Sequence, residues 1–263
     1  MVSGMTNKPQ SDQQRPRIGI TMRLELSTDR FYLSRYYSEA VEAAGGAPVH
    51  LSLIPEPEYI AAMIYSLDGV LLPGSDSDVD PLRYGAQPHP QLGSVVPLKD
   101  ETDLLVLQEL DRRKVPLFAI CFGMQILNVF RGGTLIQDIA TQLSNSIKHE
   151  QGPPRDRPSH TITLANTSRL AALAQAESAV VNSHHHQAIE NVGDNLKATA
   201  WASDGLIEAV EDTRPNRFAL GVQWHPELGW QKDALSQKLF SEFVKACAAN
   251  RSGNAGSLVA TPG

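Results

Sequence analysis

The sequence predicts a single α/β domain, a three-layer sandwich in which helices cover both faces of a mixed, mostly parallel central sheet. Short apolar strands alternate with helices through the first half of the chain, an order that favours parallel pairing. Strands become more frequent from about residue 160, which gives the sheet its mixed character. No internal repeat or domain linker interrupts this order, so one domain accounts for the chain of 263 residues.

Apolar periodicity defines the elements of the first half. A compact apolar run indicates a strand, whereas apolar residues at every third or fourth position indicate a helix. The first helix begins near Leu33 and ends at Gly45 and Gly46, because glycine commonly terminates helices. We expect strands at 17–22, 47–54, 69–72 and 116–120, and helices at 33–44, 59–65, 100–113 and 123–131.

The second half follows from the same patterns. We expect strands at 161–164, 179–182, 196–202, 207–211 and 218–224, and helices at 168–175 and 233–248. The two ends of the chain, 1–16 and 249–263, are rich in Ser, Gly, Asn, Gln and Pro and lack apolar spacing. We therefore expect disordered tails on either side of a domain at 17–248.

Composition restricts the class of protein. Apolar residues make up 41% of the chain, as in a globular protein with a buried core. The formal net charge of -6 lacks the positive excess that attracts nucleic acid. No stretch approaches the roughly 18 apolar residues of a membrane span, and the first residues lack the apolar segment of a signal peptide. We expect a cytoplasmic protein that binds neither nucleic acid nor membrane.

The chain has two cysteines, which cannot form a disulfide framework and include no Cys-x-x-Cys zinc pair. This usage indicates a reducing compartment. Cys247 follows Leu239 and Phe243 at four-residue steps on the last expected helix, so we expect a small core residue there. Cys121 instead follows directly after an apolar strand.

Residues 76–99 form a polar, proline-containing stretch that is too long for an ordinary connection. Long ordered loops often line or cover a site, so we expect this one to shape a pocket. Asp76, Asp78 and Asp80 alternate along it as in a calcium loop, but the glycine and closing glutamate of an EF-hand are absent. The expectation is a solvated turn.

Cys121 occupies the position of a nucleophile at a sharp strand-to-helix turn. Such a turn needs small residues two places before and after its apex, and Ala119 and Gly123 meet that need. The start of the following helix favours thiolate over thiol, and the N–H of Phe122 points to where an oxyanion would form. The competing interpretation is a buried structural cysteine at the end of a core strand.

A second motif, in which His225 is followed two residues later by Glu227, supports the nucleophile. Side chains at positions i and i+2 of an extended chain lie on the same side, so Glu227 can orient His225. His225 can then take the proton of the thiol. Alone, such a pair is more often a surface hydrogen bond, but together with Cys121 it predicts a catalytic triad.

Four motifs follow one another along the chain. They are Pro73-Gly74-Ser75, Cys121 to Gln125 with Asn128 and Gly132 to Leu135, Asn182 to Gln187, and Gly221 to Glu227. In this order they resemble the class I glutamine amidotransferase superfamily, whose fold is flavodoxin-like. Within it, the chain is most similar to the stand-alone γ-glutamyl hydrolases of peptidase family C26, the group that contains γ-glutamyl-γ-aminobutyrate hydrolase. The resemblance covers about residues 17–248, and four spaced motifs make it specific.

The resemblance implies a hydrolase that works through a γ-glutamyl thioester without a cofactor. Cys121 would attack the amide carbonyl, His225 would act first as base and then as acid, and Glu227 would hold His225. The N–H groups of Gly74 and Phe122 would form the oxyanion hole. Contacts to the substrate would come from Ser75, Gln125, Ser183, His184, His185, His186 and Gln187.

One position departs from the subgroup, in which many hydrolases have arginine directly after the nucleophile. This chain has Phe122 there. The oxyanion N–H does not depend on the side chain, so the chemistry is unaffected, but we expect the acceptor side of the substrate to differ. The resemblance therefore leaves the identity of the leaving amine open.

The run from His184 to His186 raises the question of a metal. Adjacent residues of an extended chain point alternately to opposite faces, so the three rings cannot converge on one ion. No cysteine or carboxylate cluster lies at ligand spacing around them. We expect no metal there, and one or two of the rings to face the site.

Two classes of function remain open. The first is an independent thiol hydrolase that acts on a small γ-glutamyl substrate. The second is a glutaminase-type subunit that delivers ammonia to a separate synthase partner, or a non-catalytic relative. The sequence carries no fused synthase domain, and the long segment 76–99 can shape a private pocket, so both favour the first. A homodimer is the default expectation for the oligomeric state.

Overall fold

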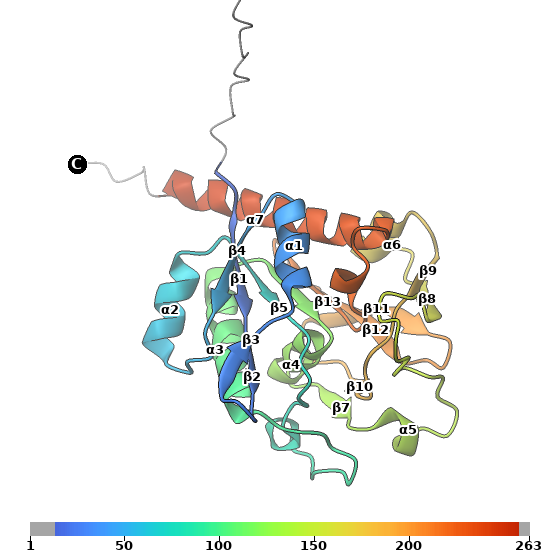
Figure 1. Cartoon of the computed structure of the whole chain (residues 1–263). Helices are drawn as coiled ribbons and strands as arrows, with labels where there is room; N and C mark the ends of the chain where they lie inside the picture. Colours follow the sequence, from blue (N-terminus) through green and yellow to red (C-terminus); the bar gives the residue numbers. More distant parts are fainter. Residues whose placement is uncertain (1–13, 258–263) are drawn as a thin grey trace, which may run out of the picture.

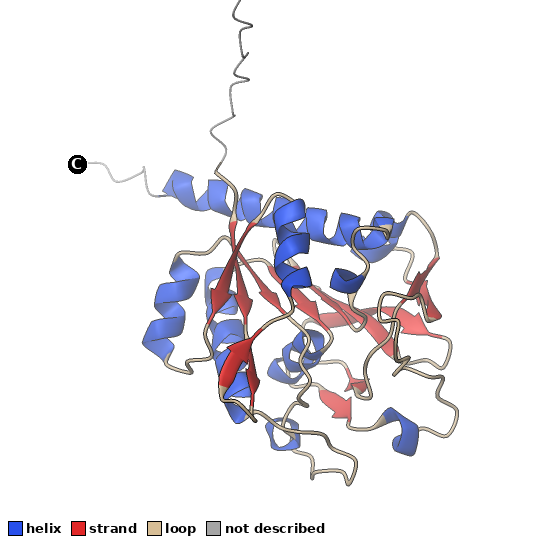
Figure 2. Ribbon diagram, in the orientation of Figure 1, coloured by secondary structure: helices blue, strands red, loops and turns tan. Residues whose placement is uncertain are grey.

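The structure is a computed structural model that describes residues 14–257 (Figure 1). Within that range, eleven strands form one sheet, and β2 (Arg23–Glu25) and β3 (Arg30–Tyr32) form a separate two-stranded hairpin. Helices flank the large sheet (Figure 2), so the expected α/β class is confirmed. The ends of the two expected tails, 1–13 and 258–263, lie outside the described residues.

One half of the sheet is parallel. Two of its strands, β5 (Gly69–Leu72) and β6 (Leu117–Ile120), are buried along their whole length, as continuous apolar runs predict. In spatial order the half consists of β4 (Ala47–Leu51), β1 (Arg17–Thr21), β5 (Gly69–Leu72), β6 (Leu117–Ile120) and β13 (Ala219–Val222).

The other half is antiparallel and continues from β13. It consists of β12 (Ile207–Asp212), β11 (Leu196–Ala202), β8 (His160–Leu164) and β9 (Ser178–Val181). Two short strands that the sequence did not predict extend it: β10 (Ala188–Asn191) pairs with β12 and with β7 (Thr134–Ile136). Runs of three or four residues are too short to show a period.

Helices pack on both faces of the sheet and enclose two apolar clusters. One face carries α1 (Arg35–Ala43), α6 (Arg169–Ala174) and α7 (Ala234–Ser257), and the other carries α2 (Pro57–Tyr65), α3 (Pro97–Arg113) and α4 (Phe122–Phe130). The remaining helical segments are α5 (Ile139–Gln142) and two 3₁₀ turns, η1 (Pro81–Tyr84) and η2 (Pro226–Leu228). Residues 97–99, expected in the long loop, belong to α3.

Helix α7 is longer than the sequence indicated. We expected it to end at residue 248 and a disordered tail to follow, but the helix continues to Ser257. Asn250 Nδ2 donates to the carbonyl oxygen of Asp68 over 3.2 Å, and Arg251 Nη1 donates to that of Gln14 over 2.9 Å. These partners are distant in sequence, so apolar spacing could not reveal them. Among the described residues, no helix has both the length and the apolar character needed to cross a bilayer.

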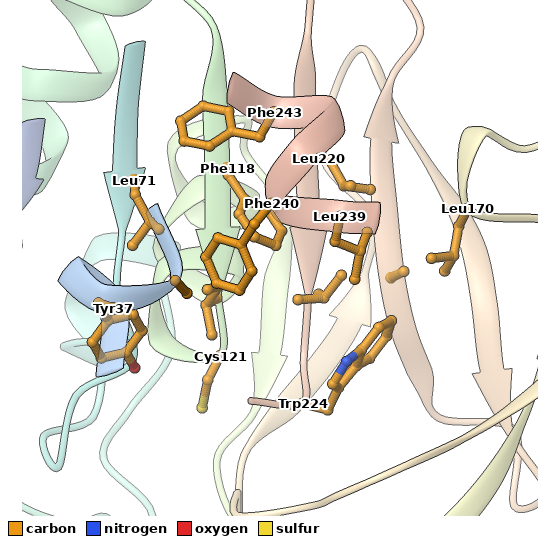
Figure 3. Close-up of a cluster of buried hydrophobic side chains, with 14 of the residues drawn as sticks. Tyr37, Leu71, Phe118, Cys121, Leu170, Leu220, Trp224, Leu239, Phe240 and Phe243 are labelled. Carbon is orange, nitrogen blue, oxygen red and sulfur yellow. The ribbon is translucent and has the colours of Figure 1, made fainter. Parts of the chain in front are cut away.

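Strand β6, which leads to Cys121, is anchored on both faces. Phe118 packs edge-to-face on Phe240 of α7, with the ring centroids 5.4 Å apart. Its neighbours Leu117 and Ala119 are buried in the cluster on the opposite face. Figure 3 shows Cys121 beyond Phe118, with its sulfur pointing away from the aromatic rings. The core therefore fixes the strand directly before the expected nucleophile.

Cys247 lies in the same core and is fully buried, as the sequence predicted. It packs against β5 at Gly69, where a Cβ atom would lie 2.1 Å from the Cys247 sulfur and 3.4 Å from the Phe243 ring. The absence of a side chain at position 69 therefore allows α7 to approach the sheet closely.

We predict that Gly69→Ala lowers the free energy of unfolding by about 1–3 kcal/mol, because the added methyl group overpacks this contact. Cys247→Ala in the same chain should recover part of that loss, since it removes the clashing sulfur. Urea unfolding of the two single variants and the double variant measures the coupling. Purely additive losses would contradict the contact.

Candidate active site

Cys121 lies at the apex of a sharp turn between β6 and α4. Its φ of 51° and ψ of −108° are a strained conformation for a residue other than glycine. Its backbone N–H donates to the carbonyl oxygen of Val222 over 2.8 Å. A Cβ atom at Gly123 would lie 2.2 Å from the Leu72 carbonyl oxygen, so only glycine fits there. This geometry is that of a nucleophile turn.

Two N–H donors of the protein lie next to Cys121. The N–H of Phe122 lies in the first turn of α4, where backbone N–H groups have no acceptor within the helix. Gln223 Nε2 lies 3.5 Å from the Cys121 sulfur and can donate to it. Gln223 belongs to a motif that we recognised, but its contact with the thiol was not expected.

His225 and Glu227 form a buried pair. His225 Nδ1 lies 2.7 Å from Glu227 Oε1, and both residues are almost inaccessible to solvent. The reason for the contact differs from the expected one, because Pro226 begins a 3₁₀ turn and the segment is not extended. Because Nδ1 contacts the Glu227 carboxylate, Nε2 is the ring nitrogen that can exchange a proton with the thiol.

Asn182 holds the backbone of His225 and was missed as a site residue. Its side-chain amide donates to the His225 carbonyl oxygen and accepts from the His225 N–H, each over 2.8 Å. This two-point contact joins the end of β9 to the end of β13. Asn182 is the first residue of a recognised motif, yet only the fold shows what it contacts.

The charges around His225 favour its protonated form. Burial alone would lower its pKa, but the Glu227 carboxylate and the Cys121 sulfur outweigh burial and raise the pKa to about 10. Burial acts on Glu227 in the opposite direction, and the His225 imidazolium overcomes it and lowers the pKa of that carboxyl. The arrangement therefore favours an imidazolium between the Glu227 carboxylate and the Cys121 sulfur.

Gly74 lies close to this pair. A Cβ atom there would be 2.7 Å from His225 Cε1, so the close backbone approach that we expected at this position requires glycine. Its N–H, expected in the oxyanion hole, donates in this structure to the Tyr37 hydroxyl over 3.0 Å. Tyr37 is fully buried on α1 and also lowers the pKa of Glu227. No sequence pattern pointed to a role for Tyr37 at the site.

A cavity of about 290 Å³ opens above Cys121. Its walls carry charges of both signs and several amides and hydroxyls. The lining residues are Arg23, Ser75, Asp76, Ser77, Asp78, Cys121, Gln125, Glu150, Arg155, His184, His185, His186, Gln187 and His225. The long segment 76–99 supplies part of this wall, consistent with its expected role.

Most of the residues expected to contact substrate line this cavity, but Ser183 does not. Ser183 is fully buried, and its hydroxyl donates to the His149 carbonyl oxygen over 2.6 Å. Gln125 lines the cavity as expected, and its Nε2 donates to the Gln187 carbonyl oxygen over 3.3 Å. Asp78 is buried and its carboxylate accepts from the Gly93 N–H, so the expectation of a solvated turn is wrong at this residue.

Phe122 does not change the cavity in the way we expected. Its side chain is buried in the cluster beneath α4, where the Lys99 ammonium lies 5.1 Å from the ring centroid. Because this side chain does not line the cavity, it gives no direct reason for a different acceptor side. The cavity is instead lined by two arginines, Arg23 and Arg155. Arg23 Nε donates to the Gly74 carbonyl oxygen, and its guanidinium pairs with Asp76. Its place just after β1, at the carboxyl edge of the parallel strands, was an available signal.

The three histidines of the run diverge. His184 Nε2 lies 2.9 Å from the Arg155 carbonyl oxygen, and His186 Nε2 lies 2.8 Å from Asp78 Oδ1. His185 Nδ1 lies 2.8 Å from the Gln187 carbonyl oxygen. The three rings therefore form hydrogen bonds with different partners, although all three border the cavity.

The fold is that of the class I glutamine amidotransferases. The solved structure of a putative GMP synthase component from Thermoplasma acidophilum matches with a TM-score of 0.62 and 13% identity, covering 92% of this chain and 98% of that chain. At this identity, the likeness shows the fold alone.

Sequence comparison then gives the family. The peptidase C26 family model matches residues 16–227, so the chain belongs to the peptidase C26 family, as its motifs predicted. Protein NtpR of Enterococcus hirae is 36% identical over 238 residues, covering 88% of this chain and 98% of that protein. The gamma-glutamyl-gamma-aminobutyrate hydrolase PuuD of Escherichia coli is 36% identical over 222 residues, covering 82% and 86%.

We predict that iodoacetamide at neutral pH alkylates Cys121 and spares Cys247. Cys121 borders the cavity, whereas Cys247 is fully buried and burial raises the pKa of its thiol well above its ordinary value. His225→Ala should slow labelling of Cys121 by about tenfold or more, because it removes the cation that stabilises the thiolate. His50→Ala, at an exposed position outside the cavity, is the matched control. Peptide mass spectrometry reads the result, and equal labelling of both thiols on folded protein would refute the prediction.

We predict that His225 titrates with a pKa of about 10 and that Glu227→Gln lowers this pKa, since the carboxylate raises it. The folded pKa lies above the ordinary value of about 6.5, so protonated His225 stabilises the fold fully below that pH. This stabilisation is lost as the pH rises through about 10. Imidazole NMR titration and unfolding measured across this pH range test both statements. Titration of wild-type His225 near its ordinary value would show that the pair is not coupled.

Proposed function

We propose that this chain is a cysteine-dependent hydrolase that cleaves the γ-glutamyl amide bond of a small γ-glutamyl amine and releases glutamate. The observation that carries this proposal is the cavity of about 290 Å³ in which Cys121 and His225 face walls of polar and charged groups. A γ-glutamyl group carries both an ammonium and a carboxylate, which such walls can pair with. Membership of the peptidase C26 family supports hydrolysis as the reaction class.

In the first half of the proposed reaction, the Cys121 thiolate attacks the γ-carbonyl carbon. A C–S bond forms, and the carbonyl oxygen takes up the negative charge beside the Phe122 N–H at the start of α4. The His225 imidazolium, oriented by Glu227, gives its proton to the departing amine. The C–N bond breaks and a γ-glutamyl thioester remains on Cys121.

In the second half, water replaces the amine. Neutral His225 takes a proton from the water molecule, whose oxygen attacks the thioester carbonyl carbon. The C–S bond then breaks, glutamate leaves, and Cys121 and His225 return to the thiolate and imidazolium pair. A second oxyanion donor becomes available if the Gly74 N–H turns from the Tyr37 hydroxyl, 3.0 Å away, toward the substrate.

Arg155 provides the basis for a preference among leaving amines. Arg23 is 11% exposed and is already held by Gly74 and Asp76, whereas Arg155 is exposed where it lines the cavity. A guanidinium in that position can pair with a carboxylate on the leaving amine. We therefore favour an amino acid or γ-aminobutyrate as leaving group over a polyamine, in line with the name of the Escherichia coli relative.

We predict that the purified chain alone releases glutamate from γ-glutamyl-γ-aminobutyrate faster than from γ-glutamylputrescine or glutamine. Cys121→Ala should lose activity by about 10³-fold or more, while Cys247→Ala, at the other thiol, should keep it. Arg155→Gln should raise KM for the carboxylate-bearing substrate and leave KM for γ-glutamylputrescine nearly unchanged. Coupled detection of glutamate measures all of these rates.

Two results would overturn parts of this proposal. A wild-type chain as inert as Cys121→Ala on the whole panel would favour the glutaminase-type subunit, which needs a synthase partner. Equal effects of Arg155→Gln on all substrates would remove its assigned role at the leaving amine while leaving the hydrolase itself in place.

A further inference from the structure

A buried cluster of histidine and carboxylate side chains lies beside the catalytic cavity. His149 precedes β8, His160 begins β8, His185 lies between β9 and β10, and Glu208 lies on β12. None of the four side chains is more than 7% exposed. The cluster shares His185 with the cavity wall but includes none of the proposed catalytic residues.

One ring nitrogen of each histidine points at the same carboxylate oxygen. Glu208 Oε1 lies 3.4 Å from His149 Nδ1, 3.0 Å from His160 Nε2 and 3.6 Å from His185 Nε2. His149 Nδ1 and His185 Nε2 are 3.2 Å apart. The second oxygen of Glu208 is buried without a hydrogen-bond partner among the described residues. Ligand atoms of His149, His160 and Glu208 therefore lie within 4.8 Å of one another, and His185 Nε2 lies beside two of them.

The outward-facing nitrogens determine which inward-facing atoms carry protons. His149 Nε2 lies 2.9 Å from Asp204 Oδ2, and His185 Nδ1 lies 2.8 Å from the Gln187 carbonyl oxygen. Both partners only accept hydrogen bonds, so these nitrogens must carry the protons. When both rings are neutral, His149 Nδ1 and His185 Nε2 are acceptors that face each other and the Glu208 carboxylate. A cation bound between them would satisfy all three groups.

A divalent metal ion can supply that cation. Two carboxylates, Asp204 and Glu208, contact the three rings. One divalent ion balances both of their charges.

We propose that His149, His160, His185 and Glu208 form a structural zinc site. Zinc bonds of about 2.0–2.1 Å in a tetrahedron place ligand atoms about 3.3 Å apart, and the four separations given above are 3.0–3.6 Å. Three nitrogens and one oxygen suit Zn²⁺ rather than Mg²⁺ or Ca²⁺, which prefer all-oxygen sites. The contacts of His149 with Asp204 and of His185 with the Gln187 carbonyl are the outer hydrogen bonds typical of zinc-bound histidine.

The site would fix one wall of the catalytic cavity. The ligands come from two strands, β8 and β12, and from the two loops that hold His149 and His185. Gln187 O, the acceptor for His185, also accepts from Gln125 Nε2, and the neighbouring His184 ring lies 5.9 Å from the His225 ring. A bound ion would therefore stabilise the position of the loop at 183–187.

The first test is metal content. A tag-free chain is equilibrated with zinc sulfate, freed of unbound metal by gel filtration and analysed by inductively coupled plasma mass spectrometry. We expect about one zinc per chain, since one tetrahedral site is assigned, and almost none in a His149→Gln and His160→Gln double variant. His50→Gln, at an exposed histidine outside the cluster, should bind as much zinc as the wild type.

The second test is spectroscopic and thermal. Cobalt(II) in place of zinc should give the intense visible absorption of a tetrahedral ion, and a chelator should lower the thermal midpoint reversibly in the wild type only. If the double variant fails to fold, the cobalt spectrum of the wild type decides alone. A wild type that retains neither zinc nor cobalt, a spectrum typical of octahedral cobalt, or undiminished zinc in a folded double variant would overturn the proposal.

Discussion

The strand-to-helix turn at Cys121 is the constraint on which the site depends. Its backbone conformation costs a residue other than glycine roughly 1–3 kcal/mol, which the surrounding packing must offset. That packing comes from both neighbouring strands, because Gly123 rests against the Leu72 carbonyl of β5 and the Cys121 N–H bonds to Val222 of β13. The backbone strain therefore lies at Cys121, whose thiol borders the cavity. Contacts with the central strands β5 and β13 hold Cys121 in this conformation.

Buried charges around this turn are matched in pairs. His225 pairs with Glu227 above the turn. Lys99 and Asp103, both almost fully buried on α3, pair beneath it next to Phe122. Burying single ions is costly, so each group depends on its partner. The Lys99 ammonium also lies 5.1 Å from the centroid of the Phe122 ring, so this pair contacts α4. The pairing limits which substitutions the region tolerates.

Local sequence patterns predicted most of the architecture and the three proposed catalytic residues. The parallel strands and their helices have strong periodicity, and the residues around Cys121 are informative because the turn itself restricts them. The missed residues act across the fold. Tyr37 on α1 contacts Gly74, and Asn182 at the end of β9 contacts His225. The short strands β7 and β10 form by pairing with each other. Their sequence separation hides such contacts from any local pattern.

Strand β13 has a consequence for how exactly the site must assemble. It pairs in parallel with β6, with Val222 opposite Ile120, and antiparallel with β12, with Val222 opposite Ala209. Cys121 directly follows Ile120, and His225 lies three residues after Val222. The register of β13 against β6 therefore sets the distance between His225 and Cys121. A slip of one residue between β13 and β6 would turn alternate side chains to the opposite face. It would separate His225 from Cys121 without changing either residue, so the correct register of one short central strand is itself a condition for the proposed reaction.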